Sequence, residues 1–258
     1  AGDFDNDGRL DFVVTAYQRE FTTLYRNLGG DLFADVTRQT GAGEGSFSNV
    51  KWGCGLVDFD NDGHRDLFVA CGHIDDNVEL RDDTTSYLGR CVVLRNTGNG
   101  KFVNVTDQAG DGLSQRRSHR GAAFDDLDND GRIDVVLLNS RSPPAILRNE
   151  SGNGNHWLQL QVRARQSNRD SVGARVKLVA GNLVLVDEIH SGRGYQSHYG
   201  SRLHFGLGPQ QRVDRLEIDW VGGGTGVLRD LPVDQCLTVF DSPGATSVQN
   251  SVEQGQRD

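Results

Sequence analysis

Residues 3–12 read DFDNDGRLDF, and the pattern returns as DFDNDGHRDLF at residues 58–68 and as DLDNDGRIDV at residues 126–135. A second shared piece follows each copy: LYRN at 24–27, VLRN at 93–96 and ILRN at 146–149. Starts that lie 55 and 68 residues apart suit a repeat of four short strands joined by Asn and Gly turns. The repeats therefore predict an all-β fold, with a partial β-propeller over residues 1–150.

The Asp-rich stretches are predicted to connect the strands of hairpins. The second and third each lie between two short apolar runs, as such a connection requires. Only Ala1 and Gly2 precede the first, so we expect the chain to begin inside a blade whose first strand is missing. Because a propeller needs at least about four blades, we also expect that these residues alone cannot close a ring. The isolated chain should then associate through its open edge.

The spacing of the acidic residues within each stretch is that of a calcium loop. Carboxylates at alternate positions point toward one centre, and the Gly at the sixth position allows the positive φ of a sharp turn. The predicted metal ligands are the carboxylates of Asp3, Asp5, Asp7 and Asp11 with the carbonyl of Arg9; those of Asp58, Asp60, Asp62 and Asp66 with the carbonyl of His64; and those of Asp126, Asp128, Asp130 and Asp134 with the carbonyl of Arg132.

This donor set favours Ca²⁺. If the last Asp binds through both oxygens, each loop offers about six oxygens and needs one water to reach about seven, whereas Mg²⁺ demands an octahedron. An EF-hand would need Glu at the twelfth position, where Val14, Val69 and Leu137 stand, so these loops close earlier, into a strand. Turn formation alone could explain one such loop but not three in the same register. We predict about three Ca²⁺ per chain.

Charge supports a cation as a folding ligand. Lys and Arg number 27 against 36 Asp and Glu, a formal charge of −9 that argues against nucleic acid as the partner. Of the 36 acids, 29 are Asp, which suits turns and hard-cation sites better than helical surfaces. Crowded carboxylates repel one another unless a cation neutralises them. Three Ca²⁺ would reduce the charge from −9 to −3, so we expect calcium to stabilise the fold.

The second half of the sequence predicts a separate β domain over residues 151–241. Apolar and polar residues alternate as in half-buried strands, with Gly-rich or polar segments between them. Three clear cases are Leu158, Leu160 and Val162; Leu203, Phe205 and Leu207; and Leu216, Ile218 and Trp220. A small antiparallel sandwich or barrel is the expected shape. Residues 242–258 are polar and predicted to form a frayed tail.

These motifs resemble a known pair of families. Residues 1–149 are similar to the FG-GAP (VCBS) calcium-loop repeats of β-propellers such as the integrin α-subunit head. Residues 152–239 resemble the ASPIC/UnbV domain that follows such repeats in cartilage acidic proteins and many bacterial secreted proteins. The second resemblance rests on GNHWL at 154–158, SNRDSVGARV at 167–176, SGRGY at 191–195, LHFGLG at 203–208, VDRLEIDW at 213–220 and PVDQ at 232–235. The departures are Asp125, where Gly is expected, and VGG at 221–223 in place of Pro-Ser-Gly.

No catalytic motif was found, so we predict no catalytic residues and no organic cofactor. Nucleophile elbows, phosphate loops, HExxH and GxGxxG patterns are all missing from the sequence, and its histidines are scattered. Asn168, Arg169 and Asp170 form a polar turn, interpreted as an Arg–Asp pair that pins a loop or as a site for a polar ligand such as a glycan. The acidic insertion at 73–83 is either a solvated loop or an extra cation site.

The four cysteines are predicted to act mainly as small side chains that pack in the core. Cys54, Cys71, Cys91 and Cys236 lack zinc-type spacing and are interpreted as buried small hydrophobes, with one disulfide among the first three left open. No run of about 18 apolar residues predicts a membrane span. The chain contains no Met, so we interpret it as a processed chain or a fragment.

The leading functional prediction is an extracellular, calcium-binding, non-enzymatic module of the adhesion type, which binds a protein or a glycan. Such calcium loops suit the abundant calcium outside cells, so a secreted, periplasmic or cell-surface location is expected. The alternative is a structural subunit that binds further copies of itself in a fibre or surface layer. A metal-dependent enzyme or enzyme accessory is the weakest reading, because one ion per loop leaves no open Lewis-acid position.

Overall fold

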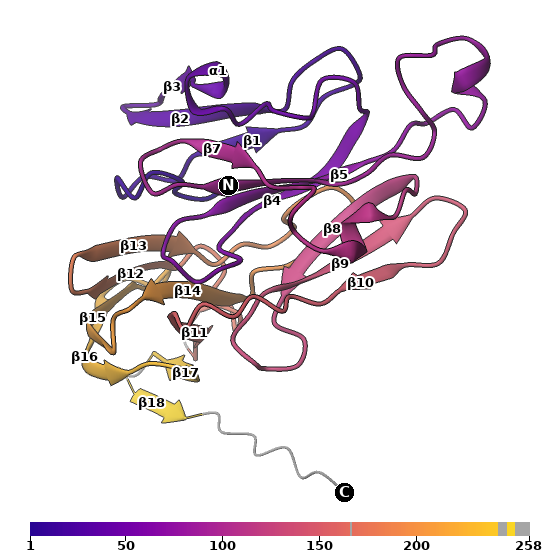
Figure 1. The fold of residues 1–258 in the computed structure, drawn as a ribbon. Coiled ribbons are helices and arrows are strands. Elements are labelled where there is room, and N and C mark those ends of the chain that lie inside the picture. The colour runs from indigo at the N-terminus through magenta and orange to yellow at the C-terminus, as the bar shows by residue number, and fades with distance from the viewer. Residues whose placement is uncertain (166, 242–246, 251–258) are drawn as a thin grey trace, which may run out of the picture.

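The computed structural model describes residues 1–165, 167–241 and 247–250, and nearly all of its regular structure is β-sheet. The first three sheets follow one another along the chain and are called blades 1, 2 and 3 (Figure 1). Blade 1 contains β1 (Phe12–Val14), β2 (Thr23–Gly29) and β3 (Leu32–Asp35); blade 2 contains β4 (Lys51–Val57), β5 (Asp66–Cys71), β6 (Val92–Asn96) and β7 (Phe102–Asn104); and blade 3 contains β8 (His119–Asp125), β9 (Asp134–Asn139) and β10 (Ala145–Leu147). Strands that are neighbours in sequence pair antiparallel within each blade.

Only blade 2 has all four strands of the predicted unit. The first strands of blades 2 and 3, β4 and β8, are here called the inner strands. In blade 1 a single bridge between Gly2 and Asp11 stands in the place of an inner strand. Blade 3 has no fourth strand among the described residues. Within the described part of the chain, helical structure is limited to α1 (Thr37–Thr40) and two short 3-10 turns, Val78–Leu80 and Asp111–Ser114. None of the described sheets closes on itself, which confirms the partial propeller.

The blades stack face on face because the repeat places apolar side chains at the same positions on each. In blade 2, Leu67, Leu94 and Phe102 point to one side, here called the front face, and pack on blade 1. In blade 3, Val135 and Leu147 occupy the positions of Leu67 and Leu94 and belong to the apolar core shared with blade 2. Each interface buries a continuous apolar core, which is the dominant stabilising term for such short strands.

The last eight strands form a two-layer sandwich, here called the C-terminal sandwich. One sheet has the order β14 (Arg202–Gly208), β11 (His156–Arg163), β17 (Gln235–Phe240) and β18 (Ser247–Asn250); the other has the order β13 (Leu183–Glu188), β12 (Arg175–Ala180), β15 (Arg212–Asp219) and β16 (Thr225–Pro232). The predicted alternating residues fill its core, with Leu158, Leu203 and Leu216 at most 1% exposed. The predicted sandwich is thereby confirmed.

One detail of that prediction is wrong: β11 and β17 pair parallel, so the sandwich is not purely antiparallel. The chain crosses to the other sheet between these strands, and such a crossover permits a parallel pair. Strand β18 falls within the predicted polar tail, of which residues 242–246 and 251–258 lie outside the described part. The described residues contain no helix long and apolar enough to cross a membrane.

Candidate metal loops and their surroundings

The three Asp-rich stretches, called loops 1, 2 and 3, fold alike. In loop 2 the Asp58 carboxylate accepts hydrogen bonds from the backbone N–H groups of Asp62 (3.2 Å) and Gly63 (2.8 Å), which draws the loop into a tight turn. Asp3 and Asp126 make the same two contacts in loops 1 and 3. The glycines of the turns, Gly8, Gly63 and Gly131, have φ of 85–88°, a region that L residues rarely adopt. This agrees with the role predicted for the sixth position.

The last Asp of each loop connects it to the second shared sequence piece. The Asp66 carboxylate accepts a hydrogen bond from the N–H of Phe59 at the start of its loop (3.2 Å) and another from the N–H of Asn96 in β6 (2.8 Å). Asp11 and Asp134 do the same through Asn27 and Asn149. Sequence reasoning missed the role of these three Asn residues, although their recurrence in LYRN, VLRN and ILRN was the available signal.

The structure gathers three carboxylates of each loop so that one oxygen from each lies within 4.8 Å of the others. These clusters are Asp3, Asp5 and Asp11; Asp58, Asp60 and Asp62; and Asp126, Asp128 and Asp134. The fourth predicted carboxylate of each loop, on Asp7, Asp66 or Asp130, lies outside its cluster. Nine of the twelve predicted carboxylate ligands are therefore brought together in three separate groups.

The chemistry of these clusters fits a hard divalent cation. Oxygen Oδ1 of Asp5 and that of Asp60 are buried without a hydrogen-bond partner in the described structure. Burial raises the pKa of Asp11 to about 7 and that of Asp66 to about 8, and burial together with neighbouring carboxylates raises the pKa of Asp58 well above its usual range. A bound cation would supply the missing partner and favour the charged carboxylates.

The loops differ in their positive neighbours. Arg26 Nε lies 2.6 Å from Asp5 Oδ2 in loop 1, and Arg148 Nη2 lies 2.8 Å from Asp128 Oδ2 in loop 3. Among the described residues no arginine forms an ion pair with the carboxylates of loop 2, where His64 also replaces the arginines found at position seven of the other loops. Loop 2 therefore contains the least compensated carboxylate cluster.

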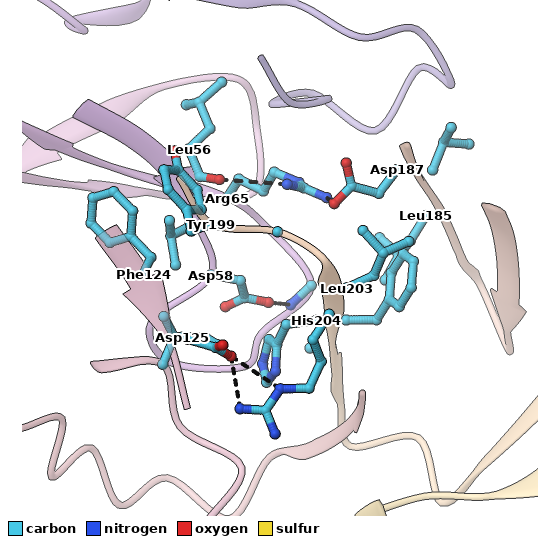
Figure 2. Close-up of a pocket in the computed structure, with 18 of the residues that line it drawn as sticks. Leu56, Asp58, Arg65, Phe124, Asp125, Leu185, Asp187, Tyr199, Leu203 and His204 are labelled. Carbon is cyan, nitrogen blue, oxygen red and sulfur yellow. Dashed lines mark hydrogen bonds and ion pairs between the residues drawn. The ribbon is translucent and has the colours of Figure 1, made fainter. Parts of the chain in front are cut away.

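The C-terminal sandwich packs against loops 2 and 3 (Figure 2). Arg65 Nη2 lies 2.8 Å from Oδ2 of Asp187 in β13, and Arg193 Nη2 lies 3.4 Å from the other oxygen. Burial alone would raise the pKa of Asp187, but the two guanidinium groups hold it well below its usual range. Because Asp187 is buried, this ion pair is part of the contact between blade 2 and the sandwich.

A cavity of about 60 Å³ lies in this contact. It is lined by Asp58 and Arg65 from blade 2, Phe124 from blade 3, and Asp187 and His204 from the sandwich (Figure 2). Sites for small organic ligands usually measure about 300–1,000 Å³. The cavity has room for water but not for a substrate of ordinary size.

The other sequence interpretations have mixed outcomes. The expected pairing within the polar turn is wrong: Asp170 pairs with Arg163 of β11, and Asn168 pins the turn by accepting from the N–H of Val172 (2.7 Å). The shape of the loop leaves Arg163 nearer to this carboxylate than Arg169. In the insertion, Asp75, Asp76 and Asp82 pair with Arg81, Arg141 and Arg19, and the described residues contain no metal-type cluster there.

All four cysteines are free thiols, and Cys71 and Cys91 are buried. Burial raises the pKa of Cys71 to about 12 and that of Cys54 to about 11, which makes both unreactive at neutral pH. Cys71 and Cys91 thus agree with the interpretation as small buried hydrophobes, whereas Cys54 and Cys236 are half-buried.

Comparison with known proteins places both halves of the chain. The profile of the FG-GAP-like repeat family matches residues 3–69 and 58–137, and the ASPIC and UnbV profile matches residues 164–247. Cartilage acidic protein 1 of Xenopus tropicalis is 26% identical over 231 residues, which are 86% of this chain and 33% of that protein. The chain thus spans about a third of the length of this relative.

A Bacteroides fragilis protein for which a cell adhesion role has been suggested has a weakly similar crystal structure. It has 11% sequence identity and a TM-score of 0.19, over 81% of this chain and 85% of that one. The family profiles carry the assignment: this chain belongs to the FG-GAP-like repeat family and continues into an ASPIC and UnbV domain.

Proposed function

We propose that this chain is an extracellular, non-enzymatic calcium-binding module of the adhesion type, which presents its blades to a protein or glycan partner. The observation that carries the proposal is a cluster of three carboxylates in each of the three loops. The loops share the same turn, and the last Asp of each accepts a hydrogen bond from the second shared sequence piece. We also propose the division that the sequence predicted: blades over residues 1–150, a β domain over 151–241 and a tail over 242–258.

The residues that would hold calcium are those predicted from the sequence. The cluster carboxylates would form the centre of each site, and Asp7, Asp66 and Asp130 with the carbonyls of Arg9, His64 and Arg132 would complete it. A bound ion would neutralise the carboxylates and join the loop to the strands on either side. Because each loop lies at the end of a blade, the ions would stiffen the blades rather than take part in a reaction.

The proposed location follows from the same chemistry. Loops that lack the bidentate Glu of high-affinity sites suit the high calcium concentration outside cells, as a secreted, periplasmic or cell-surface protein would meet. The name of the relative, cartilage acidic protein 1, is compatible with an extracellular role.

Calorimetric titration of the chelator-treated chain with CaCl₂ tests the proposal. About three ions per chain are expected, with no uptake of similar strength for MgCl₂. A triple variant, Asp5→Asn, Asp60→Asn and Asp128→Asn, removes one charge from each cluster and should bind far more weakly. Uptake well below three ions, or equal uptake by the triple variant, would refute the assignment.

A second candidate function is self-assembly into an extracellular fibre or layer. The observation that favours it is the front face of blade 1, where Phe12, Tyr25 and Phe33 form an aromatic cluster with Phe33 45% exposed. Light scattering of the purified chain in calcium separates the candidates: a growing polymer supports assembly, and a species of fixed mass supports a binding module.

A further inference from the structure

A row of hydrogen bonds joins the loops of successive blades. Asn6 Nδ2 of loop 1 donates to the carbonyl of Gly63 in loop 2 (2.9 Å), and Asn61 Nδ2 of loop 2 donates to the carbonyl of Gly131 in loop 3 (2.9 Å). At the matching position in loop 3, Asn129 Oδ1 accepts instead from Arg202 Nη1 of the C-terminal sandwich (2.8 Å). The sandwich therefore takes the place that the loop of a further blade would have.

The inner strands lead to the same conclusion. A Cβ atom on Gly53 of β4 would lie 2.5 Å from the backbone N of Ala122, so the backbones of blades 2 and 3 are in direct contact. Gly121 of β8 is the equivalent position in blade 3, and a Cβ there would lie 3.1–3.2 Å from the carbonyl oxygens of Gln196 and Tyr195. The segment 195–196 of the sandwich thus covers blade 3 as blade 3 covers blade 2.

Two exceptions to the repeat pattern serve this contact. Asp125 stands where Gly2 and Val57 precede the other loops, and it accepts from Nε and Nη2 of Arg202 (3.0 and 2.7 Å). Arg65 stands where the other loops have Leu10 and Ile133, and it forms the buried pair with Asp187. Both substitutions replace a neutral residue with a charged one, and both charges face the sandwich.

The sandwich also reaches the candidate ligands themselves. Gln159 is 1% exposed, and its Nε2 donates to Asp126 Oδ2 of loop 3 (2.7 Å). The same Nε2 lies 3.4 Å from Nδ1 of His204, whose Nε2 lies 2.6 Å from Asn61 Oδ1 of loop 2. A Cβ on Gly206 would lie 2.0 Å from Asp58 Oδ2, so β14 touches loop 2 directly.

Loop 1 has a much weaker contact with the sandwich. Arg175 Nη2 donates to the carbonyl of Gly8 (3.3 Å), and the Arg175 side chain is exposed. No side chain of the described part of the sandwich forms a hydrogen bond or ion pair with a carboxylate of loop 1. The loops that share one sequence pattern are therefore unequal in their surroundings.

We propose that the C-terminal sandwich is a cap that ends the blade stack at blade 3, and that Gln159, His204 and Arg202 couple its docking to calcium in loops 2 and 3 but not in loop 1. This inference rests on the proposed calcium binding. Coupling of this kind is reciprocal: calcium in loops 2 and 3 strengthens docking, and docking strengthens calcium binding by the same factor. Because the cap covers β8, a further blade cannot pack on blade 3 as blade 3 packs on blade 2.

Calcium titration of full-length variants tests the coupling. Arg202→Gln removes the guanidinium group whose fork of N–H donors binds Asp125 and Asn129. Gln159→Leu removes the hydrogen-bond donor to Asp126 while keeping a similar side-chain volume. Both should weaken two of the three sites by about tenfold, within the usual range of coupling between sites. The matched control is Arg175→Gln, which should leave all three sites unchanged, and Arg202→Lys should restore part of the affinity by keeping the charge without the fork.

Proteolysis supplies a measurement that does not depend on separating the three sites. The connecting residues 150–154 are exposed, so a protease can reach them, and release of the cap should make cleavage there faster. We expect faster cleavage in chelator than in CaCl₂, and faster cleavage of Arg202→Gln than of Arg175→Gln at equal calcium. Circular dichroism of each variant at saturating calcium checks that the sheets remain folded.

The outcomes separate the two proposals. Three sites of unchanged affinity in Arg202→Gln and Gln159→Leu would overturn the coupling and leave the calcium proposal standing. Equal weakening by Arg175→Gln, or equal cleavage with and without calcium, would also overturn it. No calcium uptake by the unaltered chain would refute the proposed function itself.

Discussion

In blade 2, Leu67, Leu94 and Phe102 are at most 4% exposed because blade 1 covers them, whereas the equivalent residues of blade 1, Phe12, Tyr25 and Phe33, lie on an open face. The repeat has an apolar or aromatic residue at each of these positions in both blades. The sequence pattern therefore produces an apolar face suited to packing against another blade, and it does so in blade 1 as well as in blade 2. Two aromatic rings replace two leucines on the open face, and they pack on each other: the Phe12 and Tyr25 rings are 4.8 Å apart.

Removal of calcium should destabilise the blades far more than the sandwich. At free calcium about 100-fold above Kd, each loaded loop should add about 2.7 kcal/mol to the free energy of unfolding. Chelation should therefore lower the melting temperature of the blades strongly and that of the sandwich, which has its own core, much less. Differential scanning calorimetry with and without EDTA measures this, and a melting profile unaffected by EDTA would contradict it.

The buried pair between blade 2 and the cap is the next test. Asp187→Asn leaves Arg65 and Arg193 without a carboxylate in a buried site and should cost about 3–5 kcal/mol of unfolding free energy. Asp230→Asn is the matched control, because the Arg212–Asp230 pair is exposed and worth at most about 1 kcal/mol. Urea unfolding followed by circular dichroism compares them, and equal losses would show that the Asp187 pair has no special role.

Phe102 and Phe33 occupy the same repeat position, buried in blade 2 and exposed in blade 1, so substituting each of them tests how differently the two faces are covered. Phe102→Ala opens a cavity in the buried interface and should cost about 3–5 kcal/mol, whereas Phe33→Ala should cost the monomer under about 1 kcal/mol. Phe33→Ala should also reduce self-association, measured by light scattering. If Phe33→Ala proves as destabilising as Phe102→Ala, then the front face of blade 1 is covered in solution.

The smallest effect is in the pH dependence of the calcium-free chain. The pKa values of Asp11 and Asp66 are raised by burial to about 7 and about 8, above the value of about 4 in an unfolded chain. The folded state then holds more protons than the unfolded state between these values, so stability should fall as the pH rises from about 4 to 8. Calcium should flatten this dependence. Melting temperatures at pH 5 and pH 8, with and without calcium, are the measurement, and an apo chain more stable at pH 8 would contradict it.

The parts of the molecule that recur were predictable from the sequence. Three copies of DxDNDG reveal the loops, and the alternation around Leu158 and Leu203 reveals the sandwich, because period and spacing report local geometry directly. The parallel pairing of β11 with β17 was not predictable, since it joins strands far apart in sequence. Docking of the cap was signalled only by residues that break the repeat, Asp125 and Arg65, whose partners lie in the other half of the chain.

We propose that each of the three loops binds one calcium ion. Anomalous X-ray scattering from crystals of the full chain grown in CaCl₂ would locate these ions. We expect one anomalous peak in each cluster, about 2.3–2.6 Å from the carboxylate oxygens of Asp5, Asp60 and Asp128 and their cluster partners. Loops without peaks at millimolar calcium, or ions held only elsewhere on the chain, would contradict it.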